Sequence, residues 1–496
     1  MKNKKVIVVG GGIAGLSAGI YAKKCGFDVT IFESHSIAGG ICTSWRRKGY
    51  LFEGGMHWLA GSNPSSAINK LWYYLGALDD SVEIRYSEPF IEYLHDGVPI
   101  RFYRDVDETE RYLISISPDD AKEINNFCNG VRKIKKLEMP IANVRGVKMT
   151  GKKSNPPISS IFAMLSAVGM IRKYAGIERD EYISRFSHPG IREVMRAITY
   201  PEMGIAPLIF TLGSLAGGDG GFPSGGSLPF ANRMVKSFTN AGGEIRYKSQ
   251  VERVLVENKK AVGVLVNGKR FNADAVIIAS DTMAVDKLFD FPLDSKWLTE
   301  MRATTSPTMA VFVSLGIDAD LRKYPTYGIY KADEPLVISD QTFEYISVAN
   351  YANDPDYSPA GKSVFTIQLP GDTYDYWKKI RDEGRYEEEK QKIGEELIKR
   401  LSAKIPEMAG KVEVCDVATP LTYERYCGNW KGSWMTNMTK DMKMKSYPGF
   451  IKGLDGVYFA GQRLMPPGGI PVAMMTGRRA VQYLCKDTGT VFEGEG

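Results

Sequence analysis

Residues 4–24 carry the clearest hydrophobic pattern in the chain. An uninterrupted apolar run from Val6 to Val9 leads into a glycine-rich stretch, Gly10 to Gly15, and residues 16–24 then continue as a helix-forming segment. A short, continuous apolar run that ends in glycines is typical of a strand buried on both faces of a parallel sheet. The sequence therefore predicts a strand, a tight turn and a helix, in that order.

The spacing of Gly10, Gly12 and Gly15 predicts a phosphate-binding turn. Gly10 allows the tight turn, Gly12 lets a pyrophosphate approach the backbone, and Gly15 lets the helix pack closely on the strand. Ile13 and Ala14 open the helix, whose first N–H groups and positive dipole end favour phosphate.

A second strand is predicted over residues 28–32 and ends at Glu33, which is followed by Ser34. An acid about 20 residues beyond the glycine turn is the group that binds ribose hydroxyls in a dinucleotide-binding fold. We therefore expect an α/β protein with a Rossmann-like nucleotide domain. Residues 242–254 alternate like one further strand, and residues 273–280 read as a returning buried strand.

Two glycine pairs extend this pattern. Gly39 and Gly40, with Ile41 and Thr43, follow the acid, and the pair Gly54 and Gly55 lies in the segment after them, followed by Met56 and His57. These residues resemble the motif that follows the ribose acid in the amine oxidase and phytoene desaturase superfamily of FAD enzymes. Many relatives carry Arg or Lys where Ile41 stands, so Arg46 and Arg47 are the alternative phosphate contacts.

The C-terminal segment carries the most specific resemblance. Gly461 and Gln462 are followed by Gly469, Ile470 and Pro471, in a stretch similar to the closing FAD motif of carotenoid desaturases, carotenoid isomerases and retinol saturases. Gln462 stands where many wider relatives have an acid. The resemblance implies one FAD, bound by these residues and by the motifs above. It also implies that the backbone of Val251 lies against the adenine.

The FAD motifs are far apart in the sequence, so the cofactor domain must be discontinuous. We place it at residues 1–85, 215–285 and 445–490, with residues 86–214 and 286–444 forming an inserted α+β substrate domain. A single glycine turn follows a strand, and we find no second nucleotide fold for NADH or NADPH. Quinone, oxygen or another electron carrier is then the expected electron acceptor, unless the reaction has no net redox change.

Composition excludes several other classes. The net charge of +6, from 64 basic and 58 acidic residues, is too small to imply binding of nucleic acid. The six cysteines form no CxxC pair and the four histidines no ligand spacing, which predicts no metal and a reducing, cytoplasmic location.

Residues 158–171 form a largely apolar stretch with basic residues on both sides. Fourteen residues are too few to span a bilayer. The stretch is either a core helix or an interfacial helix that makes a peripheral membrane contact and opens the site to lipid.

Candidate catalytic residues are few because the flavin itself carries the difficult step. His57, next to the flavin in the family motif, is the first candidate for a substrate contact or proton donor. Tyr200 and Glu202 are candidates for the pocket lining. Tyr423 and Tyr426 are secondary candidates, because their segment resembles one that reaches the substrate side of the flavin in carotenoid isomerase relatives. Structural packing is the alternative interpretation of His57, Tyr423 and Tyr426, and a solvated loop is the alternative for Tyr200 and Glu202.

Three function classes remain open. The first is an FAD enzyme that desaturates, saturates or isomerises an apolar polyene, isoprenoid or unsaturated lipid. The second is an amine-oxidase-like enzyme that acts on a small amine, which the carotenoid-like closing segment disfavours. The third is a non-catalytic prenyl- or lipid-binding module of the same fold, which the intact phosphate turn and ribose acid disfavour.

Overall fold

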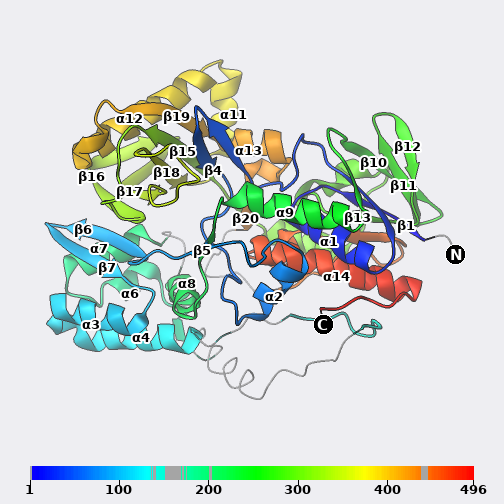
Figure 1. The fold of residues 1–496 in the computed structure, drawn as a ribbon, viewed down its shortest axis with the longest axis horizontal. Helices are drawn as coiled ribbons and strands as arrows, with labels where there is room; N and C mark the ends of the chain where they lie inside the picture. The colour runs from blue at the N-terminus through cyan, green and yellow to red at the C-terminus, as the bar shows by residue number, and fades with distance from the viewer. Residues whose placement is uncertain are drawn as a thin grey trace.

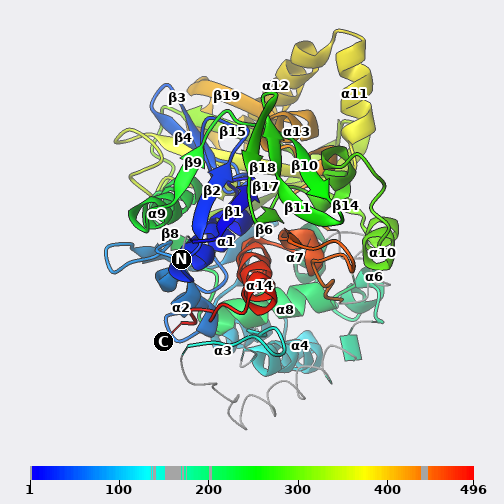
Figure 2. The same cartoon turned by 90° about the vertical axis from the view of Figure 1, so that its right-hand side faces the viewer.

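A computed structural model describes residues 3–135, 137, 141–150, 169, 173–174, 176–199, 204–436 and 445–495. Two large sheets organise this part of the chain, one parallel and one mixed (Figures 1 and 2). In Figure 1 the parallel sheet and both described ends of the chain lie on the right, and the mixed sheet lies on the left. The predicted α/β class with a Rossmann-like parallel sheet is confirmed, whereas the limits of the two domains stay a prediction.

The parallel sheet is assembled from three distant stretches of chain. Its strand order is β21–β13–β1–β2–β9, and every neighbouring pair is parallel. The strands are β1 (Lys5–Val9), β2 (Asp28–Phe32), β9 (Glu244–Arg246), β13 (Ala275–Ile278) and β21 (Val457–Phe459). The long-range assembly explains why the nucleotide motifs recur near both ends and in the middle of the sequence.

The apolar run of β1 is explained by burial on both faces of the sheet. Val6 and Val8 pack with α1 (Ile13–Lys24), α9 (Ser227–Asn240) and α14 (Ile470–Thr488). Ile7 and Val9 pack against the antiparallel sheet β10–β11–β12. The latter strands are β10 (Val251–Glu257), β11 (Lys260–Val266) and β12 (Lys269–Asn272).

The single strand expected over residues 242–254 is two strands in the structure. β9 joins the parallel sheet and β10 joins the antiparallel one. Between them the backbone turns at Lys248, whose φ is 50°. Alternation alone does not show such a break, because both halves keep the same period of two.

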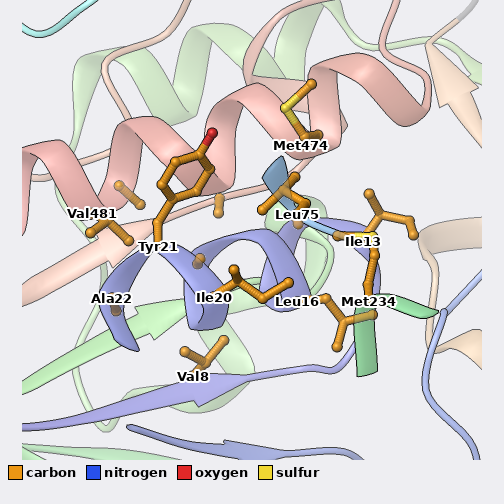
Figure 3. Close-up of a cluster of buried hydrophobic side chains, with 14 of the residues drawn as sticks. Val8, Ile13, Leu16, Ile20, Tyr21, Ala22, Leu75, Met234, Met474 and Val481 are labelled. Carbon is orange, nitrogen blue, oxygen red and sulfur yellow. The ribbon is translucent and has the colours of Figure 1, made fainter. Parts of the chain in front are cut away.

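Helices α1 and α14 pack side by side on the parallel sheet (Figure 3). The hydroxyl of Ser17 donates a hydrogen bond to the carbonyl of Met474 at 2.8 Å. A Cβ atom built on Gly477 would lie 2.3 Å from the carbonyl oxygen of Ala14, so only glycine allows this approach. Farther along both helices, Tyr21 of α1 lies beside Val481 of α14. The two helices therefore run in the same direction.

The mixed sheet has the order β19–β15–β18–β17–β16–β6–β7 and is antiparallel except at the β16–β6 pair. Its strands are β6 (Ile91–His95), β7 (Val98–Phe102), β15 (Ala310–Ile317), β16 (Tyr327–Ile338), β17 (Gln341–Asn350), β18 (Ser363–Pro370) and β19 (Val412–Ala418). Three helices share a core with it: α11 (Tyr374–Asp382), α12 (Tyr386–Lys404) and, through Leu421, α13 (Pro420–Cys427).

A helical layer packs against β6 and β7. Its members are α3 (Val106–Ile116), α4 (Ala121–Ile134), α6 (Arg179–Ile183), α7 (Pro189–Ala197) and α8 (Ala206–Ala216). The other helices in the described part of the chain are α2 (Ala67–Tyr74) and α10 (Lys296–Thr304). Its 3-10 turns are η1 (Pro118–Asp120), η2 (Thr282–Leu288), η3 (Pro406–Met408), η4 (Trp430–Gly432) and η5 (Gln462–Leu464). Short pairs are β3 (Ser44–Arg47) with β4 (Tyr50–Glu53), β5 (Ile84–Arg85) with β8 (Phe222–Pro223), and β14 (Pro307–Thr308) with β20 (Met435–Thr436). Among the described residues, no helix has the length and apolar character needed to cross a membrane.

The contact of α1 with α14 gives a stability prediction. Gly477→Ala adds a methyl group against the backbone of Ala14 and Ala18, where no side chain can rotate away. Overpacking of this kind costs about 1–3 kcal/mol. Chemical denaturation should show that loss of unfolding free energy. The control is Gly176→Ala, because a Cβ on Gly176 meets nothing within 4 Å. Equal stability of the two variants would contradict the packing described for α1 and α14.

Candidate functional site

The first glycine turn has the geometry expected of a phosphate site. Gly10 adopts a φ of 100°, and its N–H donates to the carbonyl of Phe32 at 2.8 Å. Gly12 forms the N-cap of α1 with extended backbone and no side-chain cap, so the first N–H groups of the helix are left for a ligand. A Cβ on Gly15 would lie 1.9 Å from the carbonyl oxygen of Gly10. Gly15 is therefore needed for the turn to fold, whereas the missing side chain of Gly12 keeps the space in front of the turn open.

Glu33 is buried at the end of β2 and is held in place by backbone donors. Its Oε2 accepts from the N–H of Gly11 at 2.6 Å, and its Oε1 accepts from the N–H of His35 at 2.7 Å. The hydroxyl of Ser34 also lies 3.3 Å from Oε1. The carboxylate is thus fixed beside the glycine turn, and Oε2, which has a single donor, keeps a further lone pair for a ribose hydroxyl.

The glycine pair Gly39 and Gly40 lies directly against the turn at Gly10 to Gly15. The N–H of Gly39 donates to the carbonyl of Gly11 at 2.9 Å, and Gly12 and Gly39 form a parallel bridge. Gly39 and Gly40 have φ values of 118° and 61°, which favour glycine. The carbonyl of Ile41 accepts from the N–H of Thr43 at 2.8 Å, so this backbone closes its own turn.

Arg46 and Arg47, the alternative phosphate contacts, are both used elsewhere. Arg46 donates to the carbonyls of Gly49 and Asp356, and Arg47 pairs with Asp416 at 3.2 Å. Both lie on the β3–β4 hairpin. Both guanidinium groups therefore already have partners away from the glycine turn.

The closing motif places a second helix N-terminus beside this site. Gly469 is the N-cap of α14, with a φ of 93° and no side-chain cap, and Ile470 and Pro471 open the helix. Gln462 accepts from the N–H of Gly469 at 3.0 Å through its side-chain oxygen. The N–H of Gly461 donates to Thr476 at 3.0 Å, which ties the end of β21 to α14.

Both turns leave room for a ligand. A Cβ built on Gly12 would find no atom closer than 3.9 Å, and one built on Gly461 none closer than 4.0 Å. Glycine cradles of this kind, next to two uncapped helix ends and a fixed carboxylate, fit a dinucleotide. Val251 is the buried first residue of β10, where its backbone pairs with Val266.

The turn after β4 carries the next group of predicted residues. Glu53 accepts from the N–H groups of Gly55, Met56 and Ser227 at 2.9, 3.2 and 3.0 Å, and from the hydroxyl of Tyr357 at 3.0 Å. Burial raises the pKa of Glu53 despite these donors. The buried carboxyl therefore holds the turn that carries His57 against the start of α9.

His57 sits between the cofactor turn and the mixed sheet. Its Nε2 lies 2.9 Å from the side-chain nitrogen of Gln368, and its carbonyl accepts from the hydroxyl of Tyr327 at 2.7 Å. Its ring is stacked on Phe312, with planes 2° apart and centroids 6.2 Å apart. Burial lowers the pKa of His57 to about 4, so the imidazole is neutral at physiological pH.

Aromatic side chains surround His57. Phe312 contacts Tyr423 and Trp434 at centroid distances of 5.3 and 5.2 Å. On the other side, Phe90 contacts Trp58 at 6.1 Å and Tyr327 at 5.7 Å. We call these six residues the aromatic cluster: Trp58, Phe90, Phe312, Tyr327, Tyr423 and Trp434. Trp58 is 41% exposed, so the cluster is open to solvent on that edge.

Helix α13 links the two halves of the site. The hydroxyl of Tyr423 donates to the carbonyl of Gly54 at 3.1 Å, beside the turn of His57. One turn later, Tyr426 is 47% exposed and contacts the ring of His35 at 5.5 Å. The helix thus extends from the aromatic cluster to His35, two residues after Glu33.

Some predicted residues lie outside the described part of the chain. These are Tyr200, Glu202 and the segment 158–171 apart from Gly169. Within the described ranges, no group of three or more His, Cys, Asp or Glu residues could hold a metal ion.

Sequence reasoning missed Phe312, Tyr327, Gln368 and Trp434. Phe312 and Gln368 lie within strands β15 and β18, whose apolar runs give no sign of which residue faces a ligand. The one sequence feature that points toward this group is the aromatic content of residues 423–434, which core packing explains equally well.

Comparisons with known proteins agree with this geometry. The family of flavin containing amine oxidoreductases matches residues 13–485. Prolycopene isomerase 2 from an Oncidium hybrid cultivar is 24% identical, over 97% of this chain and 84% of its own. The 1-hydroxycarotenoid 3,4-desaturase of a Flavobacterium species is 22% identical, over 96% of this chain and 98% of its own. A solved putrescine oxidase with bound putrescine has a TM-score of 0.60 at 16% identity, covering 98% and 99% of the two chains, which shows the shared fold alone.

The glycine geometry predicts opposite outcomes for two substitutions. Gly12→Val fits the extended backbone and open space of the empty turn, but its side chain takes the place of the pyrophosphate. The variant should keep its melting temperature without FAD and fail to bind FAD, as measured by flavin absorbance after gel filtration. Gly15→Ala, by contrast, should lower the melting temperature itself because its Cβ meets the backbone of Gly10. Full FAD occupancy in Gly12→Val would refute the assignment of this turn.

Proposed function

The chain belongs to the family of flavin containing amine oxidoreductases and uses FAD, and from this premise we propose that it desaturates, saturates or isomerises an apolar polyene. The observation that carries the proposal is that His57 is buried and uncharged and that aromatic side chains surround its ring. Burial is the cause of the lowered pKa of His57, and the cluster around the ring consists of aromatic side chains. Such walls suit a hydrocarbon and exclude water from it.

The relatives in sequence support the same substrate class. The prolycopene isomerase and the carotenoid desaturase match nearly the whole chain, and both are named for carotenoid substrates. The likeness to putrescine oxidase concerns the fold. A small amine is the second candidate substrate. We place it second because its ammonium group would meet a neutral imidazole beside the aromatic cluster, and the one buried carboxyl at this turn, Glu53, is already occupied by four donors.

The proposed roles of the residues follow from their positions. FAD, when bound, takes up or gives a hydride at its flavin ring. Its phosphates would lie at the glycine turns and helix ends, with the ribose at Glu33 and the adenine beside Val251. The full proposed set is Gly10, Gly12, Ile13, Ala14, Gly15, Glu33, Ser34, Gly39, Gly40, Ile41, Thr43, Gly55, Met56, His57, Val251, Gly461, Gln462, Gly469, Ile470 and Pro471.

His57 and Tyr423 are the proposed substrate-side residues, and Tyr200 and Glu202 stay proposals of the sequence. The domain limits of 1–85, 215–285 and 445–490 against 86–214 and 286–444 are likewise proposed. Quinone, oxygen or another carrier is the proposed electron acceptor, in line with the single nucleotide fold found in the sequence.

The substrate class can be tested with the holoenzyme. Under anaerobic conditions, carotenoid-type polyenes should either bleach the oxidised flavin or be converted by the photoreduced enzyme, with products resolved by chromatography. Primary amines should leave the flavin spectrum unchanged. Replacing Phe312 by Ala should lower polyene turnover, because it removes the ring on which His57 and Tyr423 pack. Turnover of simple amines without a response to any polyene would refute the proposal.

A membrane contact through residues 158–171 is the finer part of the proposal, since it would let a poorly soluble substrate leave a lipid surface. Polar substitutions at Phe162 and Leu165 should lower turnover of a polyene held in liposomes more than turnover of a short soluble analogue. Equal losses on the two substrates would argue against the contact and leave the substrate class untouched.

A further inference from the structure

We infer that Gln368 is a positioning residue that fixes the ring of His57 in one neutral tautomer and leaves its Nδ1–H as a donor for the substrate. The inference rests on the proposed function, because it assigns a role to the same site. It does not depend on which polyene is bound.

The first step is the strand register. Gln368 of β18 lies directly opposite Phe312 of β15. Side chains of directly opposed residues in an antiparallel pair project from the same face of the sheet. His57 uses both members of this pair, since its ring stacks on Phe312 and its Nε2 meets Gln368. The backbone of His57 is held as well, through the hydrogen bond from Tyr327 to its carbonyl. The ring is thus fixed in plane, in rotation and in position.

The second step is the direction of the hydrogen bond. Nε2 of His57 lies within hydrogen-bond distance of the amide nitrogen of Gln368, at 2.9 Å. An amide nitrogen donates and does not accept, so Nε2 must be the unprotonated, accepting nitrogen. A neutral imidazole carries its one proton on the other nitrogen, Nδ1. Among the residues that the structure describes, none forms a hydrogen bond with Nδ1 of His57.

The third step concerns the charged groups around the ring. Three titratable side chains are placed next to His57 by printed contacts: Glu53, which binds the turn that carries it, Tyr327, which donates to its carbonyl, and Tyr423, which packs on Phe312. The oxygens of Glu53 accept from backbone N–H groups and from Tyr357, while burial raises the pKa of both tyrosines. Nothing among them offers His57 a negative partner, and burial alone lowers its pKa.

Protonation of His57 would also turn its accepting nitrogen into a donor. Nε2–H would then face the N–H of Gln368, and the amide would have to rotate to present its oxygen. The orientation of the Gln368 amide thus disfavours the protonated imidazolium of His57, in addition to the effect of burial. In the favoured tautomer, His57 can donate a hydrogen bond to a hydroxyl or carbonyl oxygen or to the π face of a double bond. The same nitrogen cannot take a proton from an allylic carbon, so His57 acts as a donor in this site and not as the base.

The tautomer can be observed directly in the holoenzyme. The chain has four histidines, so ¹⁵N-labelled histidine gives few signals, and His57→Phe identifies the one of interest. The wild type should show the Nδ1-protonated pattern, with a pKa of about 4. In Gln368→Leu the two tautomers should mix. In Gln368→Glu the pKa of His57 should rise by about one unit or more, because a carboxylate accepts from the protonated ring.

Turnover supplies the second measurement. Gln368→Leu should lower kcat about tenfold with KM nearly unchanged, since the ring is present but no longer held. Gln368→Glu should show a rate that falls as the pH drops through the raised pKa of His57. The control is Thr366→Val, on the same face of β18, whose hydroxyl is buried and has no hydrogen-bond partner within the described residues. It should change neither the spectra nor kcat.

The spectra need no substrate, which separates this inference from the proposed function. An Nε2-protonated ring in the wild type, or an unchanged tautomer in Gln368→Leu, would overturn the inference even if polyenes are turned over. If Gln368→Leu does not fold, Gln368→Met, which keeps the length of the side chain, takes its place under the same criterion. Correct tautomer behaviour without any polyene turnover would instead overturn the substrate class.

Discussion

The close contact of α1 with α14 is the constraint on which the cofactor site depends. Gly477 lets the backbone of α14 lie against Ala14, and Gly15 lets α1 lie against the turn at Gly10. Because the helices run in the same direction, their glycine N-caps, Gly12 and Gly469, lie toward the same end of the domain. Neither cap carries a side-chain acceptor, so two sets of N–H groups and two positive dipole ends remain available for one anionic ligand.

A buried ion pair joins this cofactor region to the aromatic cluster. Arg463 of η5 donates to Asp281, just after β13, at 2.8 and 2.9 Å, and both side chains are less than 10% exposed. Asp281 also accepts from the N–H of Trp430, and Arg463 donates to the hydroxyl of Ser433 at 2.6 Å. Losing one partner of such a pair costs about 3–5 kcal/mol, mainly through the buried charge left behind. The pair therefore fixes the backbone that leads directly into Trp434 of the aromatic cluster.

The cofactor half of the site could be predicted from the sequence because its chemistry resides in the backbone. A dinucleotide-binding turn needs glycines at fixed spacings, as at positions 10, 12 and 15, and an acid at a fixed distance, as at position 33. Such a pattern can be recognised in a single sequence. The substrate half depends on side chains brought together by register, such as Gln368 opposite Phe312. Register is set by long-range pairing, which no local window contains. His57 can be predicted because it follows the glycine motif directly, whereas its partner Gln368 cannot.

Two buried ionisable groups at this turn show why an unusual pKa does not identify a catalytic residue by itself. The pKa of Glu53 is raised, which is typical of a general acid, yet its oxygens accept from three backbone N–H groups and from Tyr357. A carboxyl with that many donors shapes the turn and has little capacity left for a substrate. His57 differs from Glu53 because it keeps a free hydrogen-bonding group. One ring nitrogen is bonded to Gln368, and the other forms a hydrogen bond with none of the described residues. Free hydrogen-bonding capacity next to the glycine turn, rather than the size of the pKa shift, is therefore the reason why His57, and not Glu53, is the proposed substrate-side residue.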